Sequence, residues 1–96
     1  ARALRPTDAA PWFYLGSIAQ KTGDLALADS LLAGAIERDP RFPGGWVRRI
    51  EVALARQEPG LARALADSAG VRGIALPPDL ARRIPPAERP AGEKGN

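Results

Sequence analysis

Residues 9–42 decide the fold, and they read AAPWFYLGSIAQKTGDLALADSLLAGAIERDPRF. The first part of this stretch places apolar and small residues three and four positions apart, which is the spacing of one helix face. Pro11 suits the first turn of a helix, where its missing N–H is not needed. We therefore expect a helix over residues 10–22, with its inner face formed by Trp12, Leu15, Gly16 and Ala19.

A turn and a second helix follow. Gly23 accepts the left-handed conformation that often ends a helix, and Asp24 is a preferred capping residue for the next one. The second helix is expected over residues 25–38, because a residue before proline, here Asp39, avoids the helical region. Residues 9–42 thus predict one helical hairpin, whose second helix turns inward Leu25, Ala28, Leu32, Ala35 and Ile36.

The same pattern returns further along the chain. Trp12 is matched by Trp46 and Pro6 by Pro40, and the number of residues that separates the two tryptophans is the same as the number that separates the two prolines. We call this interval the repeat period, and a fixed period of this length indicates a repeat of helical hairpins. Two further helices are predicted over residues 44–56 and 60–69, with Gly70 as a C-terminal cap. We expect the following side chains to be largely buried: Trp12, Leu15, Ala28, Leu32, Ala35, Trp46, Ala53, Ala62 and Leu65.

The two ends of the chain differ from this pattern. Residues 77–84 are predicted to form a short capping helix that buries Leu80 and Ile84, after a segment that crosses the last hairpin. Residues 85–96 hold no large apolar side chain and are expected to be a disordered tail. Residues 1–8 read as the end of a preceding repeat, so we expect this chain to be the C-terminal fragment of a longer protein.

Composition excludes several classes of function. The 96 residues contain no Cys and no His, which removes disulfides, thiolate or imidazole metal sites and catalytic triads that depend on His. The net charge of +3 is a slight excess of Arg, diluted by acidic residues, so no specific nucleic-acid site is expected. No apolar run approaches the roughly 18 residues that a membrane span needs. We expect no catalytic residues and no cofactor.

The chain resembles the tetratricopeptide repeat (TPR) family over about residues 1–76. The family pattern of Trp, Leu-Gly, a later Ala and a closing Pro is matched in residues 9–42 by Trp12, Leu15-Gly16, Ala28 and Pro40. Residues 43–76 resemble a second, degenerate terminal repeat, because Arg49 and Ile50 replace Leu-Gly. The resemblance implies an all-α fold of TPR-type antiparallel hairpins, that is, a fragment of an α-solenoid with about two repeats.

TPR proteins bind peptides or helices on the concave face formed by the first helix of each hairpin. Transferred by position, the resemblance points to five candidate partner-binding residues, each of which can equally be ordinary exposed helix surface: Phe13, Ser17, Gln20, Val47 and Glu51. Subfamilies that clamp a C-terminal carboxylate use Lys and Asn in this groove. This chain lacks them there, so a clamp of that kind is not expected.

The sequence therefore predicts a non-catalytic protein–protein interaction scaffold of bacterial origin, cytoplasmic or periplasmic, whose partner is a protein or peptide. The alternative is an accessory C-terminal TPR region of a larger bacterial enzyme, of the glycosyltransferase, sulfotransferase or kinase type. The N-terminal side has no cap, so Phe13 and Ile18 are expected to stay partly exposed and to offer a surface for self-association. Gly16→Leu is expected to overpack a close helix crossing, whereas Gly16→Ala is expected to be mild.

Overall fold

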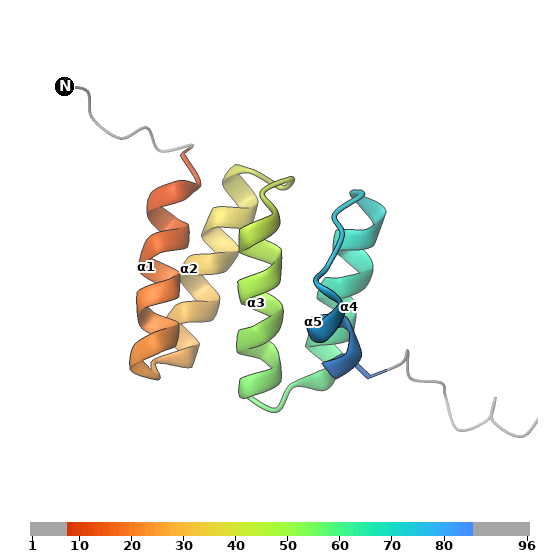
Figure 1. Ribbon diagram of the computed structural model, residues 1–96. Coiled ribbons are helices and arrows are strands. Elements are labelled where there is room, and N and C mark those ends of the chain that lie inside the picture. The colour runs from red at the N-terminus through yellow and green to blue at the C-terminus, as the bar shows by residue number, and fades with distance from the viewer. Residues whose placement is uncertain (1–7, 86–96) are drawn as a thin grey trace, which may run out of the picture.

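The structure, a computed structural model, describes residues 8–85 and is all-α, with no strand in that range (Figure 1). The expected fold class is confirmed at this level. Each helix lies within two residues of its predicted bounds. The five helices are α1 (Ala10–Thr22), α2 (Leu25–Arg38), α3 (Pro43–Ala55), α4 (Pro59–Val71) and α5 (Pro78–Arg83).

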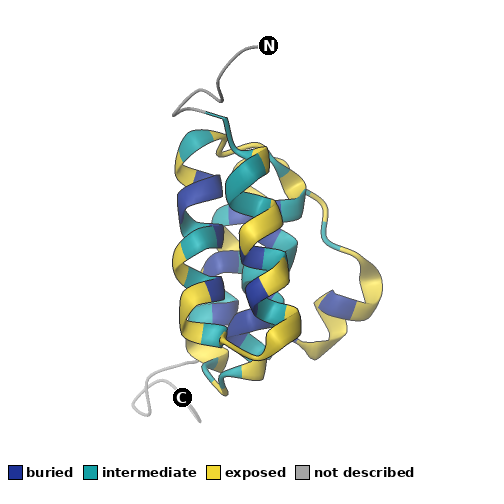
Figure 2. Cartoon of the chain, turned by 90° about the vertical axis from the view of Figure 1, so that its left-hand side faces the viewer, coloured by how far each residue is buried: buried dark blue, intermediate teal, exposed yellow. Residues whose placement is uncertain are grey.

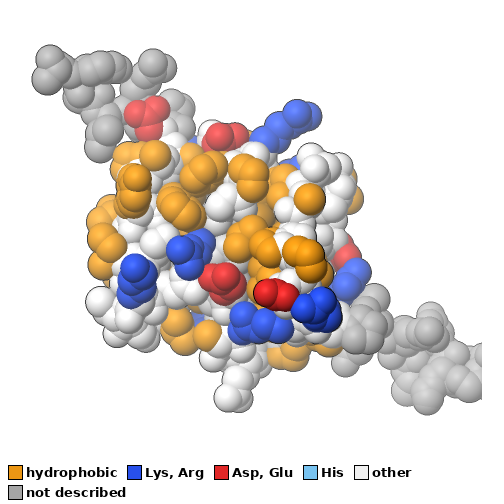
Figure 3. Space-filling view, in the orientation of Figure 1, with side chains coloured by type: hydrophobic (Ala, Val, Ile, Leu, Met, Phe, Trp, Pro, Cys, Tyr) orange, Lys and Arg blue, Asp and Glu red, His pale blue; other side chains and the backbone are white. Residues whose placement is uncertain are grey.

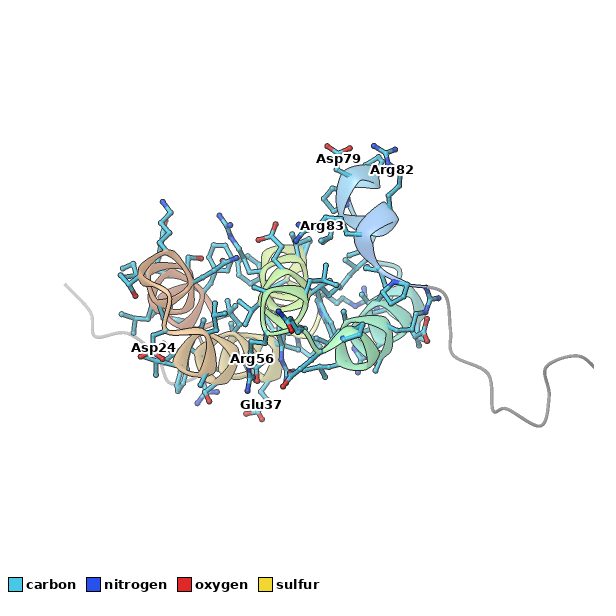
Figure 4. All side chains as sticks on the ribbon, turned by 90° about the horizontal axis from the view of Figure 1, so that it is seen from below. Asp24, Glu37, Arg56, Asp79, Arg82 and Arg83 are labelled. Carbon is cyan, nitrogen blue, oxygen red and sulfur yellow. The ribbon has the colours of Figure 1, made fainter. Side chains whose placement is uncertain are left out.

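The helices pack as two antiparallel pairs placed side by side. α1 packs against α2 and α3 against α4, while α2 and α1 both contact α3. Seen from below, α1, α3 and the short α5 lie on one side of the molecule, and α2 and α4 lie on the other (Figure 4). α1 and α3, which are the first helices of the two hairpins, therefore share one face of the molecule. α5 lies beyond α3 on that same face.

Three turns end the helices in the same way. Gly23 follows α1 with φ +91° and Gly73 follows α4 with φ +79°. Gln57 follows α3 with φ +62°, in a left-handed conformation that side chains other than glycine disfavour. The residue expected to cap α4 was Gly70, but this residue lies inside the helix, which runs one residue further. Gly73 ends it instead, because Ile74 N–H bonds back to the Ala69 carbonyl.

Helix starts follow the sequence closely. The Asp24 side chain accepts a hydrogen bond from the Leu27 N–H, which confirms its predicted role as the cap of α2. Proline opens the first turn of the other four helices. Glu58 holds the position equivalent to Asp24, one repeat period later, and its side chain makes no capping hydrogen bond.

Two apolar clusters form the core. The smaller cluster joins α1, α2 and α3 through Ala19, Ala28, Leu32 and Val52. The larger one joins α3 and α4 to the C-terminal segment, since Leu80 and Ile84 bury against it as predicted and Ile74 and Leu76 pack beside them. Its buried members are Ile36, Trp46, Ile50, Ala53, Ala62, Leu65, Ala69, Leu80 and Ile84.

The burial expectation is wrong for Leu15 and too strong for Trp12. The Leu15 side chain is 54% exposed, because no described element packs over it. Trp12 is half-buried and covers α2 within the first hairpin. The other seven residues expected in the core are buried.

Small residues set the distance between helices. A Cβ at Gly16 would lie 2.7 Å from Leu32 Cγ, so α1 and α2 cross closely at this point, as predicted. Leu32 is fully buried, so its side chain would have to shift within the core to admit the added Cβ. The expectation of a mild Gly16→Ala substitution is therefore replaced by that of a destabilising one.

Some sequence expectations concern the ends of the chain. The tail proposed for residues 85–96 and the end of a preceding repeat proposed for residues 1–8 lie, except for residues 85 and 8, outside the described residues. Within residues 8–85, no helix has the length and apolar character that crossing a bilayer requires.

Candidate partner-binding surfaces

The first surface is the α1–α3 seam, which holds four of the five residues expected to bind a partner: Phe13, Ser17, Gln20 and Glu51. Gln20 Nε2 donates a hydrogen bond to Glu51 Oε1 at 3.1 Å, which links the two first helices. Arg48 Nη1 contacts the same Glu51 oxygen at 3.3 Å. Gln20, Glu51 and Arg48 thus form a short polar chain across the shared face.

Phe13 occupies the upper part of this seam. Its ring meets the Phe42 ring edge-on, with centroids 5.0 Å apart. A Cβ at Gly44 would lie 3.0 Å from the Phe13 ring, so this glycine leaves room for the aromatic side chain at the start of α3. Phe13 is therefore half-buried between the two hairpins and presents only part of its ring to solvent.

A peptide-binding groove requires side chains that are open to a ligand, and Ser17 and Val47 do not meet this requirement. Ser17 Oγ is buried and has no hydrogen-bond partner among the described residues, and the same holds for Gln20 Oε1. Val47 packs against the larger core cluster rather than joining the seam. The structure thus brings four of the five predicted residues together and places the fifth elsewhere on α3.

A second surface was predicted only in part, because Ile18 was expected to stay partly exposed whereas Tyr14 was not considered and Leu15 was expected to be buried. Tyr14, Leu15 and Ile18 are 67%, 54% and 57% exposed, and together with the half-buried Pro11 they form one face of α1. We call these four residues the α1 outer stripe. It lies at the end of the molecule away from α4, where Figure 2 shows exposed residues along the first hairpin and Figure 3 shows apolar side chains gathered over α1.

The signal for this stripe is present in the sequence. Pro11, Tyr14, Leu15 and Ile18 follow the same spacing of three and four residues that defines the inner face of this helix. α1 therefore carries two apolar faces, of which one packs against α2. The prediction assigned Leu15 to the inner face, so it anticipated the exposure of Ile18 but not that of Leu15.

A shallow apolar pocket of about 530 Å³ adjoins the stripe at the start of α1. Pro11 and Tyr14 belong to both features, so the pocket and the stripe are continuous. The pocket is lined by Asp8, Ala9, Ala10, Pro11, Tyr14, Asp39 and Phe42.

Each tryptophan is paired with an arginine that sequence reasoning overlooked. The Arg38 guanidinium lies 3.9 Å from the Trp12 ring centre, and Arg72 lies 5.3 Å from that of Trp46. Each arginine also donates to the carbonyl four residues before it, at 3.0 Å for Arg38 and 3.2 Å for Arg72. The two arginines are separated by the repeat period, so the period itself contained this signal.

Ion pairs of two kinds occur among the described residues. Asp29 of α2 bonds to Arg49 of α3 at 2.9 Å and lies 3.9 Å from Arg56, and all three side chains are more than two-thirds covered. Asp79 and Arg82 of α5 pair at 2.6 Å but stand out into solvent (Figure 4). The first arrangement joins two helices, whereas the second is confined to one exposed helix turn.

Comparison with known proteins adds no identification. No family model, curated protein or solved structure matches this chain.

Proposed function

We propose that this chain is a non-catalytic protein-interaction module built from helical hairpins of the TPR type. The proposal of this repeat type rests on the sequence resemblance and is supported by the duplicated contacts of the two hairpins. The contact of Arg38 with Trp12 recurs one repeat period later as that of Arg72 with Trp46, at 3.9 Å and 5.3 Å from the ring centre respectively. Stacked hairpins leave an apolar face at each uncovered end, and such faces receive further protein.

The observation that carries the proposed function is the α1 outer stripe. Soluble proteins rarely leave several large apolar side chains exposed side by side, and such patches mark surfaces that bind other proteins. Three neighbouring side chains of the stripe are each more than half exposed. Isolated exposed residues such as Val71 need no such explanation.

The α1–α3 seam is the second surface of the same module. Its polar chain of Gln20, Glu51 and Arg48 offers hydrogen-bonding groups beside the half-buried ring of Phe13. A peptide that lies along this seam would meet both kinds of contact. The seam is therefore the place where a peptide ligand would bind, and the stripe is where a folded partner would pack.

Site-specific photo-crosslinking tests this function. A photoreactive amino acid replaces Ile18 in the stripe, Gln20 in the seam or Ala64 in the full chain, expressed in the cells that make it. Ala64 is a matched control because it is an exposed residue of α4, away from both surfaces. We expect a discrete protein adduct from position 18, position 20 or both, and none from position 64.

The positional comparison decides the result. Adducts of equal yield at all three positions would reflect random collisions and would contradict the proposal. The absence of any adduct at positions 18 and 20 would contradict it as well.

A further inference from the structure

The outer face of α1 has an internal counterpart whose covering is known. Positions one repeat period apart correspond in the two hairpins, so Ile18 of α1 corresponds to Val52 of α3. Val52 is fully buried in a cluster with Ala28 and Leu32 of α2, whereas Ile18 is 57% exposed. The same helix face is thus covered by a helix in one hairpin and bare in the other.

Two other positions of the face agree, whereas the equivalent of Tyr14 is Arg48, which contacts Glu51 within α3. Pro11 corresponds to Gly45, which α2 approaches so closely that an added Cβ would lie 3.2 Å from Ile36. Leu15 corresponds to Arg49, which pairs with Asp29 of α2. At both positions the α3 residue touches α2, whereas in α1 Pro11 is only half-buried and Leu15 is exposed.

We propose that the α1 outer stripe binds the second helix of a further helical hairpin, which packs antiparallel to α1 as α2 packs on α3. This inference rests on the proposed function and names the partner of that surface. The bound helix carries small and apolar side chains at the positions that Ala28, Leu32, Ala35 and Ile36 hold in α2.

The chain also specifies one difference between that helix and α2. Asp29 is accommodated against α3 because Arg49 and Arg56 face it there. Their equivalents in α1 are Leu15 and Thr22, which provide no cation. A carboxylate at the Asp29 position would be buried without a partner against α1, so the bound helix carries an apolar residue at that position.

A second copy of this chain fits the stripe poorly. The helix that it would offer in head-to-tail stacking is α4, where Arg63, Ala66 and Gly70 replace Asp29, Leu32 and Ile36. Arg63 would meet Leu15, and Gly70 would leave the space beside Pro11 unfilled. The expected partner is therefore a hairpin with an α2-like second helix rather than another copy of this chain.

An extended chain tests the inference. A copy of residues 8–41 is inserted between residues 7 and 8 of the full chain, which keeps the repeat period and places the second helix of the copy against α1. One version carries Asp29→Leu in the copy, and the other keeps Asp29 there. We expect the Leu version to have the higher thermal midpoint, by about 5 °C or more.

Two substitutions in the recipient hairpin make the test specific. Leu15→Arg supplies the missing cation, so it should reverse the preference and favour the copy that keeps Asp29. Ile18→Glu should leave the midpoint of the original chain within about 2 °C, because Ile18 is exposed there, and should remove most of the gain from the inserted copy.

Other outcomes overturn the inference. It is wrong if the two copies give equal midpoints, or if Leu15→Arg does not change their order. It is also wrong if the original chain is a dimer that Ile18→Glu dissociates, because a second copy then occupies the stripe. A crosslink from position 18 together with either result would keep the proposed function and reject only this partner.

Discussion

The guanidinium of Arg38 lies 3.9 Å from the centre of the Trp12 ring, while its Nη1 donates to the Gly34 carbonyl at 3.0 Å. Arg38 and Gly34 thus lie one helix turn apart on α2. Gly34 provides both the carbonyl that accepts the hydrogen bond from Arg38 and the position against which the Trp12 ring packs. Arg72 and Trp46 repeat the arrangement at 5.3 Å. These paired contacts connect the two helices within each hairpin.

Removing Arg38 should weaken the first hairpin. Arg38→Ala loses the cation–π contact and the packing of the aliphatic stem, and we expect it to lower the free energy of unfolding by about 1–2 kcal/mol. Arg38→Met retains most of the stem and should cost less. The equivalent Arg72→Ala should have a smaller effect, because Arg72 is exposed and lies further from its ring. Urea unfolding measures all three, and a neutral Arg38→Ala would contradict this interpretation.

Gly34 should tolerate no side chain. A Cβ at this position would contact Trp12 Cε3 and lie 2.8 Å from Cζ3, so Gly34→Ala must displace the ring from α2. We expect a loss of about 1–3 kcal/mol, although alanine favours helices.

Gly70→Ala is the matched control, since nothing lies within 4 Å of its added Cβ inside α4. It should be neutral or stabilise by up to about 1 kcal/mol. Equal effects of the two substitutions in thermal unfolding would show that Trp12 does not rest on Gly34.

Much of the fold could be predicted because its signals are local. Gly23, Asp24 and Pro40 bracket the first two helices, and their predicted bounds agree with the structure. Gly70 misled the prediction of the end of α4, because several nearby glycines can end a helix and tertiary packing selects among them. The spacing of apolar residues predicted which helix faces pack inward, and the Gly, Asp and Pro residues at the helix ends predicted where the helices begin and end.

The errors at the candidate sites have a different origin. The exposure of Leu15 depends on which elements stand beside α1, and helical periodicity does not contain that information. The role of Gly34 depends on where the Trp12 ring crosses α2, which is equally non-local. By contrast, the pairing of Arg38 and Arg72 was visible in the repeat period and was missed only because the comparison was limited to apolar residues and proline.

Gln57 should be a site of simple stabilisation. It holds φ +62° at the position equivalent to Gly23, where a residue with a Cβ is strained. Gln57→Gly should raise the free energy of unfolding by about 0.5–1 kcal/mol, because relief of strain outweighs the added freedom of the unfolded chain. The reverse change, Gly23→Gln, should destabilise by a similar amount. A destabilised Gln57→Gly variant in urea titration would show that the left-handed conformation is not present in solution.

Burial rather than distance should determine which ion pair matters. Asp29→Asn removes the charge that faces the part-buried Arg49 and Arg56, and we expect a loss of about 1–3 kcal/mol. Asp79→Asn should change stability by less than about 0.5 kcal/mol, although the Asp79–Arg82 pair is shorter, because both side chains are exposed. Unfolding at low and high salt checks both variants. A larger effect for Asp79→Asn would reverse the assignment.

The central claim is that the α1 outer stripe binds the second helix of a further helical hairpin, and thiol labelling tests it most directly because the chain contains no cysteine. The measured quantity is the rate at which a single introduced cysteine reacts with a maleimide, which reports how accessible that position is to solvent. The three variants are Ile18→Cys, Val52→Cys and Ala64→Cys. In the original chain we predict fast labelling at positions 18 and 64 and slow labelling at position 52. In the chain extended by the Asp29→Leu hairpin, position 18 should become at least about tenfold slower, because labelling then needs local opening, while position 64 stays fast. An unchanged rate at position 18 in the extended chain would contradict the account.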